Sequence, residues 1–571
     1  MSLALACVCI NTGRTHTPHT TPPSTSSFLP SSLLHSLSSP VSGLRISKSE
    51  QRKMAGALDE GKITEYFRNK SVLITGSTGF LGKILVEKIL RVQPDVGKIY
   101  LPVRAADAAA AKRRVETEVV GKELFSLLRK KHGDGFDAFI EEKIVPLAGD
   151  VMREGFGVNK DTLRELRVTE ELNVIVNGAA TTNFYERYDV ALDVNVAGVR
   201  HMCEFAKTCP NLEVLLHVST AYVAGERQGL VQERPFRAGE TLKEGTHLDI
   251  DTEFKLAKDL KKQLDADGDL SPKDERKAMK ELGLTRARHF GWPNTYVFTK
   301  SMGEMMLGRM LGGAGDVPVV IVRPSIITSV QSDPLPGWIE GTRTIDAILI
   351  GYAKQNLPCF LADLDLVMDV MPGDMVVNAM MAATVAHATT SSEPKKSRQQ
   401  PPPPPKQADP PSVYHVSSSL RHPAPYAVLY RTGIRYFEEN PRTGPDGRAV
   451  RTRKVRFLSS IASFHLFMVL KYRLPLELLH LLSVLCCGLF GLAALYHDLA
   501  RKYRFVMQLV DLYGPFSLFK GCFDDVNLNK LRIAMASAGG PGLFNFDPKT
   551  IDWDEYFHKV HIPGVMKYVL K

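Results

Sequence analysis

The 571-residue sequence predicts an α/β protein with a doubly wound parallel sheet and a mainly helical C-terminal domain. Buried strands that alternate with helices are typical of a parallel sheet covered on both faces. Short apolar, β-branched runs follow this rhythm at 71–75, 98–103, 144–147, 174–176, 214–218 and 317–322. Beyond about residue 457 the sequence is instead rich in Leu and aromatic residues and is typical of helices.

Composition and charge exclude several classes of protein. Hydrophobic residues make up 44% and charged residues 23% of the chain, so collagen-like, coiled-coil and wholly disordered structures are ruled out. The 72 Lys and Arg exceed the 62 Asp and Glu by 10. This modest excess does not indicate a nucleic-acid partner; anionic substrates, acidic carrier proteins or membrane surfaces explain it as well. The eight cysteines lack the spacing of a zinc site or a disulfide framework, so we expect reduced thiols and no metal.

Residues 1–55 are expected to lie outside the folded domains. No Asp or Glu precedes Glu50, Ser, Thr and Pro are frequent, and basic residues are few. Such a start is typical of a plastid transit peptide, and a disordered tail is the alternative. We therefore expect a plastid (chloroplast) protein, whereas a chain that starts at Met54 would stay in the cytosol.

Two insertions interrupt the predicted α/β domain, which spans 62–440. Residues 254–288 are dense in Lys, Asp, Glu and Leu and are expected to form one or two solvated helices. They would be either a surface excursion or a substrate-binding lid. Residues 389–412 are Pro-rich and of low complexity, which predicts a solvated spacer loop rather than a ligand for a proline-binding module. A strand pattern resumes at 413–417, so this tract lies within the domain.

The helical C-terminal domain is expected over 457–571 and contains an apolar stretch. Residues 481–496 carry no charge, but this stretch is shorter than the roughly 20 residues that a membrane-spanning helix needs. Three interpretations stay open: a buried helix, an interfacial or re-entrant anchor, and a membrane span. The second would give peripheral membrane contact through 474–499.

A glycine-rich turn follows the first predicted strand. Gly76, Gly79 and Gly82 have the spacing G-x-x-G-x-x-G and open an apolar helix. Such glycines allow a tight turn, a close approach to a pyrophosphate and close packing of helix on sheet. Because the helix N-terminus also favours phosphate, the pattern predicts a Rossmann-type dinucleotide site. The predicted cofactor contacts in this turn are Gly76, Thr78, Gly79, Phe80, Leu81 and Gly82.

Arg104 ends the second predicted strand, where NAD-binding domains offer an acidic residue to the ribose. A guanidinium there favours a 2′-phosphate and predicts NADP(H). The three basic residues at 112–114 follow on a helix; one could assist, and the others would form a solvated face. Asp150 and Ala179 each follow a predicted strand and are expected to line the adenine and ribose side of the site.

Tyr296 and Lys300 lie one helical turn apart, so their side chains share a face. A free phenol has a pKa of about 10, and a neighbouring ammonium favours the phenolate. The pair is therefore suited to proton transfer, and Lys300 could also hold the nicotinamide ribose. Ser219 and Thr220 follow the strand over 214–218, at the edge where open parallel sheets bind substrates. A hydroxyl there can donate to a carbonyl oxygen that gains negative charge.

The glycine turn, the strand-end hydroxyls and the Tyr/Lys pair occur in the order typical of short-chain dehydrogenases/reductases. A closer resemblance rests on HVSTAYV (217–223), RHFGWPNTYVFTKSMGE (288–304), VVIVRPSIIT (319–328) and MPGDMVVNA (371–379). These motifs resemble the alcohol-forming fatty acyl-CoA/acyl-ACP reductases of the extended short-chain family, in particular the plant male-sterility type. The resemblance covers about 62–440 and, more weakly, the helical C-terminal domain.

The resemblance implies an activity and roles for residues. NADPH would reduce a long-chain acyl thioester of C16 type, carried by acyl carrier protein or CoA, to a primary alcohol through a bound aldehyde. Plastid-targeted plant members supply fatty alcohols for pollen-wall lipid. Tyr296 would donate the proton, Lys300 would be its partner, and Thr220 or Ser219 would polarise the carbonyl. Our own hypothesis is that keeping the aldehyde bound between the two steps requires an apolar tunnel, which the C-terminal helices and the insert at 254–288 could wall.

Two rival functions stay open. An NADP-dependent sugar or steroid dehydrogenase/epimerase would share the glycine turn and the Tyr/Lys pair, although it would not need an apolar C-terminal domain. A non-catalytic, NADP-binding membrane scaffold would not need Thr220, Tyr296 or Lys300. The basic run at 448–456 is either a docking patch for an acidic carrier or the phosphates of CoA, or a solvated linker.

Overall fold

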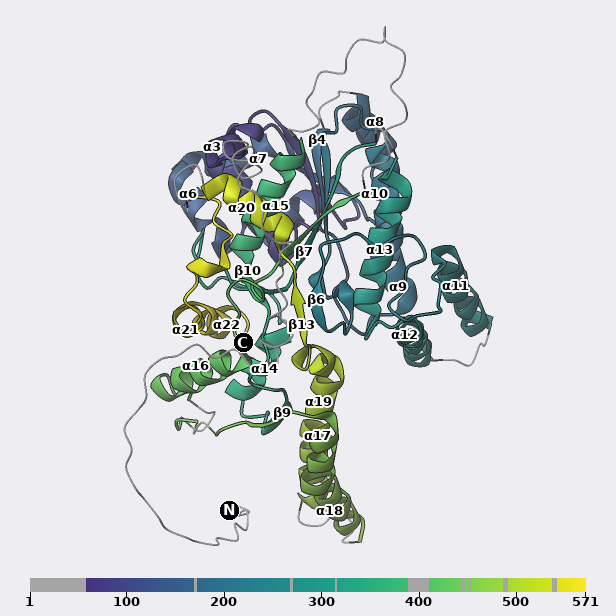
Figure 1. Ribbon diagram of the computed structural model, residues 1–571, viewed down its shortest axis with the longest axis vertical. Helices are drawn as coiled ribbons and strands as arrows, with labels where there is room; N and C mark the ends of the chain where they lie inside the picture. Colours follow the sequence, from purple (N-terminus) through teal and green to yellow (C-terminus); the bar gives the residue numbers. More distant parts are fainter. Residues whose placement is uncertain are drawn as a thin grey trace, which may run out of the picture. The chain divides into compact units, whose positions relative to one another are not determined.

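The computed structural model describes most of the chain around one central sheet (Figure 1). The described residues are 58–168, 172–266, 271–313, 316–342, 344–388, 410–443, 447–450, 453–485, 491–536 and 542–570. The predicted transit peptide, residues 389–409 of the Pro-rich tract and residues 486–490 of the uncharged stretch lie outside them.

Seven strands form a fully parallel sheet in the order β11-β7-β5-β4-β1-β2-β3. They are β1 (Ser71–Thr75), β2 (Ile99–Val103), β3 (Ile144–Ala148), β4 (Leu172–Asn177), β5 (Val214–Val218), β7 (Val319–Pro324) and β11 (Ser412–Val416). The chain winds outward from β1 to β3, returns to β4 beside β1, and winds outward in the other direction to β11. This confirms the predicted doubly wound α/β fold and puts a topological switch point between β1 and β4.

Helices cover both faces of the sheet, as a parallel sheet requires. On one face α4 (Phe80–Val92) packs on α15 (Gly373–Ala388), and on the other α10 (Gly198–Ala206) packs on α13 (Thr295–Leu311). Figure 1 shows α15 on one side of the strands and α10 and α13 on the other. All residues of β1, β2 and β7 are buried between them, which explains why their sequences are apolar throughout rather than alternating.

Shorter elements complete the α/β part. The helices are α3 (Glu60–Tyr66), α5 (Ala108–Val115), α6 (Ser126–His132), α7 (Phe136–Lys143), α8 (Lys160–Val168), α9 (Tyr188–Leu192), α14 (Thr344–Ala353) and α16 (Tyr426–Glu439). Three parallel pairs lie outside the main sheet: β8 (Ile326–Thr328) with β10 (Val370–Pro372), β9 (Cys359–Leu361) with β12 (Arg456–Leu458), and β6 (Gly229–Val231) with β13 (Gly521–Phe523).

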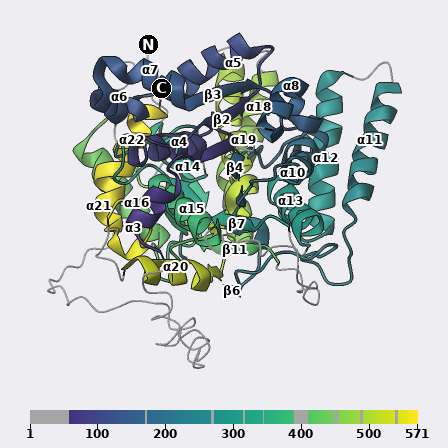
Figure 2. The ribbon, with the colours of Figure 1, turned by 90° about the horizontal axis from the view of Figure 1, so that it is seen from above.

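Two helices occupy the charged insert. They are α11 (Ile250–Ala266) and α12 (Pro272–His289), which contact each other and α9. Figure 2 shows them side by side at one edge of the molecule. Ser271 caps α12 by accepting from the backbone of Asp274, and Pro272 occupies the first turn.

The C-terminal part is mostly helical and is tied to the α/β part at several places. Its helices are α17 (Ile461–Met468), α18 (Leu474–Leu485), α19 (Leu492–Ser517), α20 (Val526–Ala536), α21 (Trp553–Glu555) and α22 (Ile562–Tyr568). Strands β12 and β13 pair with earlier strands, α20 packs on α15, and α22 packs on α14.

Helices α18 and α19 lie side by side and extend away from the sheet (Figure 1). Of the three interpretations left open for this stretch, the buried helix is wrong for α18, because its leucines are exposed. Leu474, Leu478, Leu481, Leu482 and Leu485 form a stripe with exposed fractions of 44–69%. Within the described part of the chain, no helix has the length and apolar character needed to cross a membrane.

Candidate active site

The predicted glycine turn connects β1 to α4. Gly76 has φ +74°, and a Cβ there would lie 2.7 Å from backbone atoms of Gly178. A Cβ on Gly82 would lie 2.4 Å from the carbonyl oxygen of Gly76. Both distances are shorter than any real Cβ contact, so the turn needs glycine at both positions. The N-terminus of α4 therefore lies close against the sheet, as a pyrophosphate site requires.

A cavity beside this turn, which we call the cofactor cavity, gathers all the predicted cofactor residues. Its lining includes Gly76, Thr78, Gly79, Phe80, Leu81, Gly82, Arg104, Asp150, Ala179 and Lys300. Ser219 and Tyr296 also line it. The cradle of glycines and the strand-end position fit a bound dinucleotide, because side chains would otherwise fill the approach to α4.

Two guanidinium groups line the adenosine end predicted for this cavity. Arg104 is exposed at the end of β2, and Arg114 of α5 donates to the carbonyl oxygen of Arg104 at 2.7 Å. Lys112 instead pairs with Glu141 at 2.7 Å and does not line the cavity. Of the three basic residues at 112–114, Arg114 is therefore the one that the fold brings to the site.

Tyr296 and Lys300 both point from α13 to the cofactor cavity. Asn294 caps α13 by accepting from the backbone of Val297, which fixes the first turn and Tyr296 within it. The Tyr296 ring is half-buried and stacks on Phe184, with centroids 5.8 Å apart. Lys300 is 2% exposed, and burial lowers its pKa to about 8.

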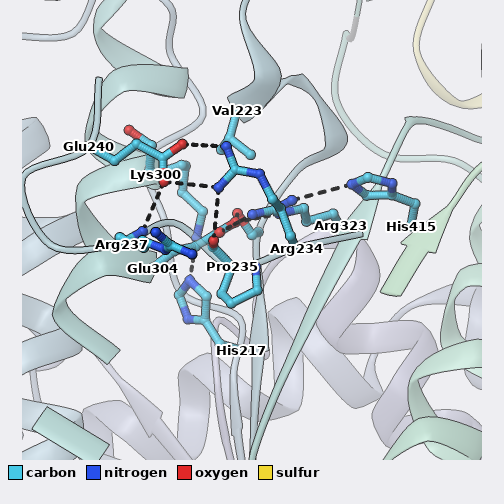
Figure 3. Close-up of polar contacts among 12 residues, drawn as sticks. His217, Val223, Arg234, Pro235, Arg237, Glu240, Lys300, Glu304, Arg323 and His415 are labelled. Atoms are coloured by element: carbon cyan, nitrogen blue, oxygen red, sulfur yellow. Dashed lines mark hydrogen bonds and ion pairs between the residues drawn. The ribbon is translucent and has the colours of Figure 1, made fainter. Parts of the chain in front are cut away.

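His217 is a buried neighbour of Lys300 that sequence reasoning missed as a site residue. The Lys300 ammonium donates to the carbonyl oxygen of Val218 at 2.7 Å and lies 3.2 Å from Nε2 of His217 (Figure 3). Burial, followed by the charge of Lys300, lowers the pKa of His217 well below its usual value, so the imidazole is neutral. The other ring nitrogen lies 3.1 Å from the amide of Asn177. The sequence signal that could have identified His217 is its place as a polar residue inside an otherwise apolar strand.

The structure distinguishes the two strand-end hydroxyls. Ser219 donates to the carboxylate of Glu304, which is itself held by a buried Arg323 (Figure 3). The hydroxyl proton of Ser219 is therefore already engaged. Thr220 donates to the carbonyl oxygen of Pro324 at a long 3.4 Å, and its oxygen accepts from the backbone of Tyr222 at 3.4 Å. Its proton is therefore more available for a substrate carbonyl than that of Ser219.

A second cavity, the substrate cavity, adjoins the first. Ser219 and Tyr296 line both, so the two cavities meet at these side chains. Thr220 and Tyr222 line the substrate cavity, and Leu512, Tyr513 and Phe516 of α19 close it. The insert helices α11 and α12 contribute no residue to either cavity, so the expectation that they wall a tunnel is wrong for these two cavities.

Comparison with known proteins gives the same family over most of the chain. An NAD-binding family model described as "Male sterility protein" matches residues 74–380, and a second model with that description matches 471–571. The chain is 44% identical to fatty acyl-CoA reductase 1 of Arabidopsis thaliana, over 90% of this chain and 100% of that protein. It is 43% identical to the alcohol-forming fatty acyl-CoA reductase of Simmondsia chinensis, over 89% and 99%. It is 38% identical to the chloroplastic fatty acyl-CoA reductase 2 of Arabidopsis thaliana, over 91% and 81%.

These matches agree with the geometry. An NAD-binding model that begins in β1 and includes the glycine turn identifies the cofactor as a nicotinamide dinucleotide. The second model covers α19, which closes the substrate cavity. The chain belongs to the fatty acyl-CoA reductase family of oxidoreductases, within the extended short-chain dehydrogenase/reductases.

Proposed function

We propose that this protein uses NADPH to reduce a long-chain fatty acyl thioester, through a bound aldehyde, to a primary fatty alcohol. The observation that carries the proposal is the meeting of the cofactor and substrate cavities at Tyr296. A carbonyl group bound at this junction would face the nicotinamide and the hydroxyls of Tyr296 and Thr220. The full-length match to relatives named fatty acyl-CoA reductases supports a thioester as substrate.

The proposed roles of the side chains follow from their positions. A bound nicotinamide cofactor would supply hydride twice, first to the thioester carbonyl carbon and then to the aldehyde. Thr220 and Tyr296 stabilise the negative charge on the carbonyl oxygen in the first step, after which the C–S bond breaks and the thiolate leaves. In the second step Tyr296 gives its proton to the alkoxide, and the nearby charge of Lys300 favours the resulting phenolate.

The main experiment is product analysis with the full chain. Purified protein and NADPH are incubated with acyl-CoA and acyl-carrier-protein thioesters of increasing length, and with a nucleotide sugar and a steroid ketone. We expect fatty alcohol from C16-type thioesters and no turnover of the other two. Turnover of the nucleotide sugar or the steroid without fatty alcohol would instead favour the rival dehydrogenase. No turnover of any substrate would favour the non-catalytic scaffold.

We propose NADPH rather than NADH because Arg104 and Arg114 line the cofactor cavity. Arg104→Asp should raise the KM for NADPH about tenfold and change the KM for NADH little, since one charge-assisted contact to the 2′-phosphate is lost. Arg113→Ala, an exposed change next to Arg114, is the control. An unchanged ratio of the two KM values would contradict the assignment.

The carrier and the compartment are part of the proposal. Arg453, Lys454 and Arg456 are exposed beside β12, where they could dock acyl carrier protein or the phosphates of CoA. A plastid location is supported by the acid-free N-terminus and by the relative named chloroplastic, and it would suit fatty alcohols made for pollen-wall lipid. A fluorescent protein fused to residues 1–55 should enter plastids, whereas a chain begun at Met54 should remain in the cytosol.

We also propose that the leucine stripe of α18 binds the surface of a bilayer. Of the 17 large apolar side chains that are exposed in the described part of the chain, 12 lie between Ile461 and Phe505. Residues 461–504 carry five Lys or Arg and two acids, and this net charge of +3 complements anionic headgroups. A bilayer would also supply long acyl substrates and accept fatty alcohols.

Vesicle flotation tests the bilayer contact with a matched control. The triple variant Leu478→Ser, Leu482→Ser and Leu485→Ser should lose binding to vesicles that contain phosphatidylglycerol. Serine at three exposed leucines elsewhere (Leu127, Leu256 and Leu420) should leave binding intact. If the wild type does not float but forms a dimer that the α18 variant abolishes, the stripe is an interface between copies and the membrane proposal is wrong.

A further inference from the structure

A third cavity lies between α14, α16, β9 and β12 and has an apolar lining. Its walls include Leu349, Phe360, Leu429 and Phe457, and no described residue that lines it is charged. Two of its tyrosines direct their hydroxyls to backbone carbonyls over long contacts: Tyr426 to Phe516 and Tyr430 to Val455, each at 3.4 Å. The cavity therefore offers little to a polar ligand and suits a hydrocarbon.

This apolar cavity shares walls with the substrate cavity. Thr344 lines the substrate cavity, and the next residue of α14, Ile345, lines the apolar cavity. The two cavities also adjoin at Tyr426 and Phe516, which are hydrogen-bonded to each other. Tyr426 lines the apolar cavity and Phe516 lines the substrate cavity. The Tyr426 hydroxyl and the backbone carbonyl of Phe516 thus meet between the place of reaction and the apolar cavity.

We propose that the apolar cavity receives the methyl end of the acyl chain and sets the chain length that the enzyme accepts. The inference rests on the proposed function. Each of the three cavities has a lining that suits one part of the reacting complex. Arginines and a glycine turn line the cofactor cavity, hydroxyls line the substrate cavity where the thioester would react, and apolar side chains line the third cavity, which suits the acyl chain. The cavity volume is about 60 Å³, which leaves room only for the last few atoms of a chain. Each methylene that enters it leaves water, so a longer chain gains affinity until this small space is full.

Gly433 is the position that most directly controls the space in this cavity. It lies in α16 and lines the cavity, and a Cβ there would meet only the Leu349 side chain, at 3.9 Å. An alanine is therefore accommodated without strain, while a leucine would project into the space that the chain would occupy. Leu349, on the opposite wall, is the complementary position, because its truncation enlarges the cavity.

The test measures chain-length preference in the full-length enzyme. Wild type, Gly433→Ala, Gly433→Leu and Leu349→Ala are assayed with NADPH and acyl-CoA from C10 to C18. We expect Gly433→Ala, which adds one methyl group to the lining, to lower kcat/KM slightly and only for the longest accepted chain. Gly433→Leu should lower kcat/KM about tenfold or more for the longest accepted chain while changing the shortest about twofold, and Leu349→Ala should shift the optimum to longer chains.

The outcomes separate this inference from the proposed function. An active wild type whose length profile is unchanged in both Gly433→Leu and Leu349→Ala would overturn the apolar cavity as the chain site and leave the reductase activity standing. A wild type that makes no alcohol from any thioester would overturn the proposed function itself. Binding of NADPH by each variant shows that it is folded, and if Gly433→Leu does not fold, Leu349→Ala alone decides the question.

Discussion

The two ends of the active site are built in different ways. The glycine turn of the cofactor end is local, because one strand, one turn and one helix hold Gly76 and Gly82 in a fixed relation. The substrate end gathers Thr220, Tyr296 and Phe516 from segments far apart in the chain, one of them in the C-terminal part. The difference teaches that cofactor binding can be lost by a local change, whereas the reaction depends on how distant segments fold together.

The largest expected effect separates chemistry from cofactor binding. Tyr296→Phe should lower kcat about 10³-fold, because the proton donor is lost, and should leave the Kd for NADPH nearly unchanged. Tyr185→Phe is the matched control, since this neighbouring tyrosine lines neither cavity. Steady-state kinetics give kcat, and the fluorescence of bound NADPH gives the Kd. Full activity in Tyr296→Phe would contradict the assigned role.

The next effect tests the local end. Gly82→Ala should weaken NADPH binding about 100-fold, because the added Cβ would lie 2.4 Å from the Gly76 oxygen and would displace α4 from the turn. Gly308→Ala is the control: Gly308 is also helical, and a Cβ there meets nothing within 4 Å. Titration calorimetry measures both variants. Equal affinities would show that the turn tolerates a side chain.

A third prediction tests which contacts attach the C-terminal part to the α/β part. His561 is buried and bridges two segments, with Nδ1 3.2 Å from the Ser329 hydroxyl and Nε2 3.2 Å from the Asp346 carboxylate. His561→Ala should lower the free energy of unfolding by about 2 kcal/mol, because both partners stay buried without it. The exposed His497→Ala should change it little. Denaturant titration measures the free energy of unfolding of both variants.

The smallest effect concerns pH. Burial disfavours the ammonium of Lys300, so it should lose its proton near pH 8 rather than near the ordinary value of 10.5. Above pH 8, kcat/KM should therefore fall about tenfold per pH unit. The unfolded chain keeps this proton to higher pH, so between 8 and 10.5 this group makes the free energy of unfolding rise with pH.

Lys300→Arg provides the control for the pH profile. A guanidinium stays charged throughout this range, so whatever activity remains in the variant should no longer fall near pH 8. A fall in kcat/KM that persists unchanged in Lys300→Arg would assign it to another group.

Sequence patterns predicted the local end well. The fold class follows from apolar runs that alternate with helices. The glycine turn follows from spacing, because Gly82 packs on Gly76 within the same turn, although the close approach of Gly178 to Gly76 comes from a distant segment. The residues expected at the cofactor all line one cavity, because parallel strands end at the same edge of the sheet.

The substrate end could not be predicted in the same way. The choice between Ser219 and Thr220 depends on Glu304, which reaches Ser219 only through the packing of α13. Whether the insert at 254–288 is a surface excursion or a lid could not be decided, because charge and length do not say which face a helix pair covers. The sequence could not predict that the α18 leucines are exposed either, since a helix with a leucine stripe has the same sequence whether or not a partner covers the stripe.

The central claim is tested most directly by the stoichiometry of the reaction. Full-length protein is given a palmitoyl thioester and limiting NADPH, and both the NADPH consumed and the hexadecanol formed are quantified. The account predicts two molecules of NADPH oxidised for each alcohol, with no free aldehyde accumulating. One molecule of NADPH for each released aldehyde, with no alcohol, would contradict it.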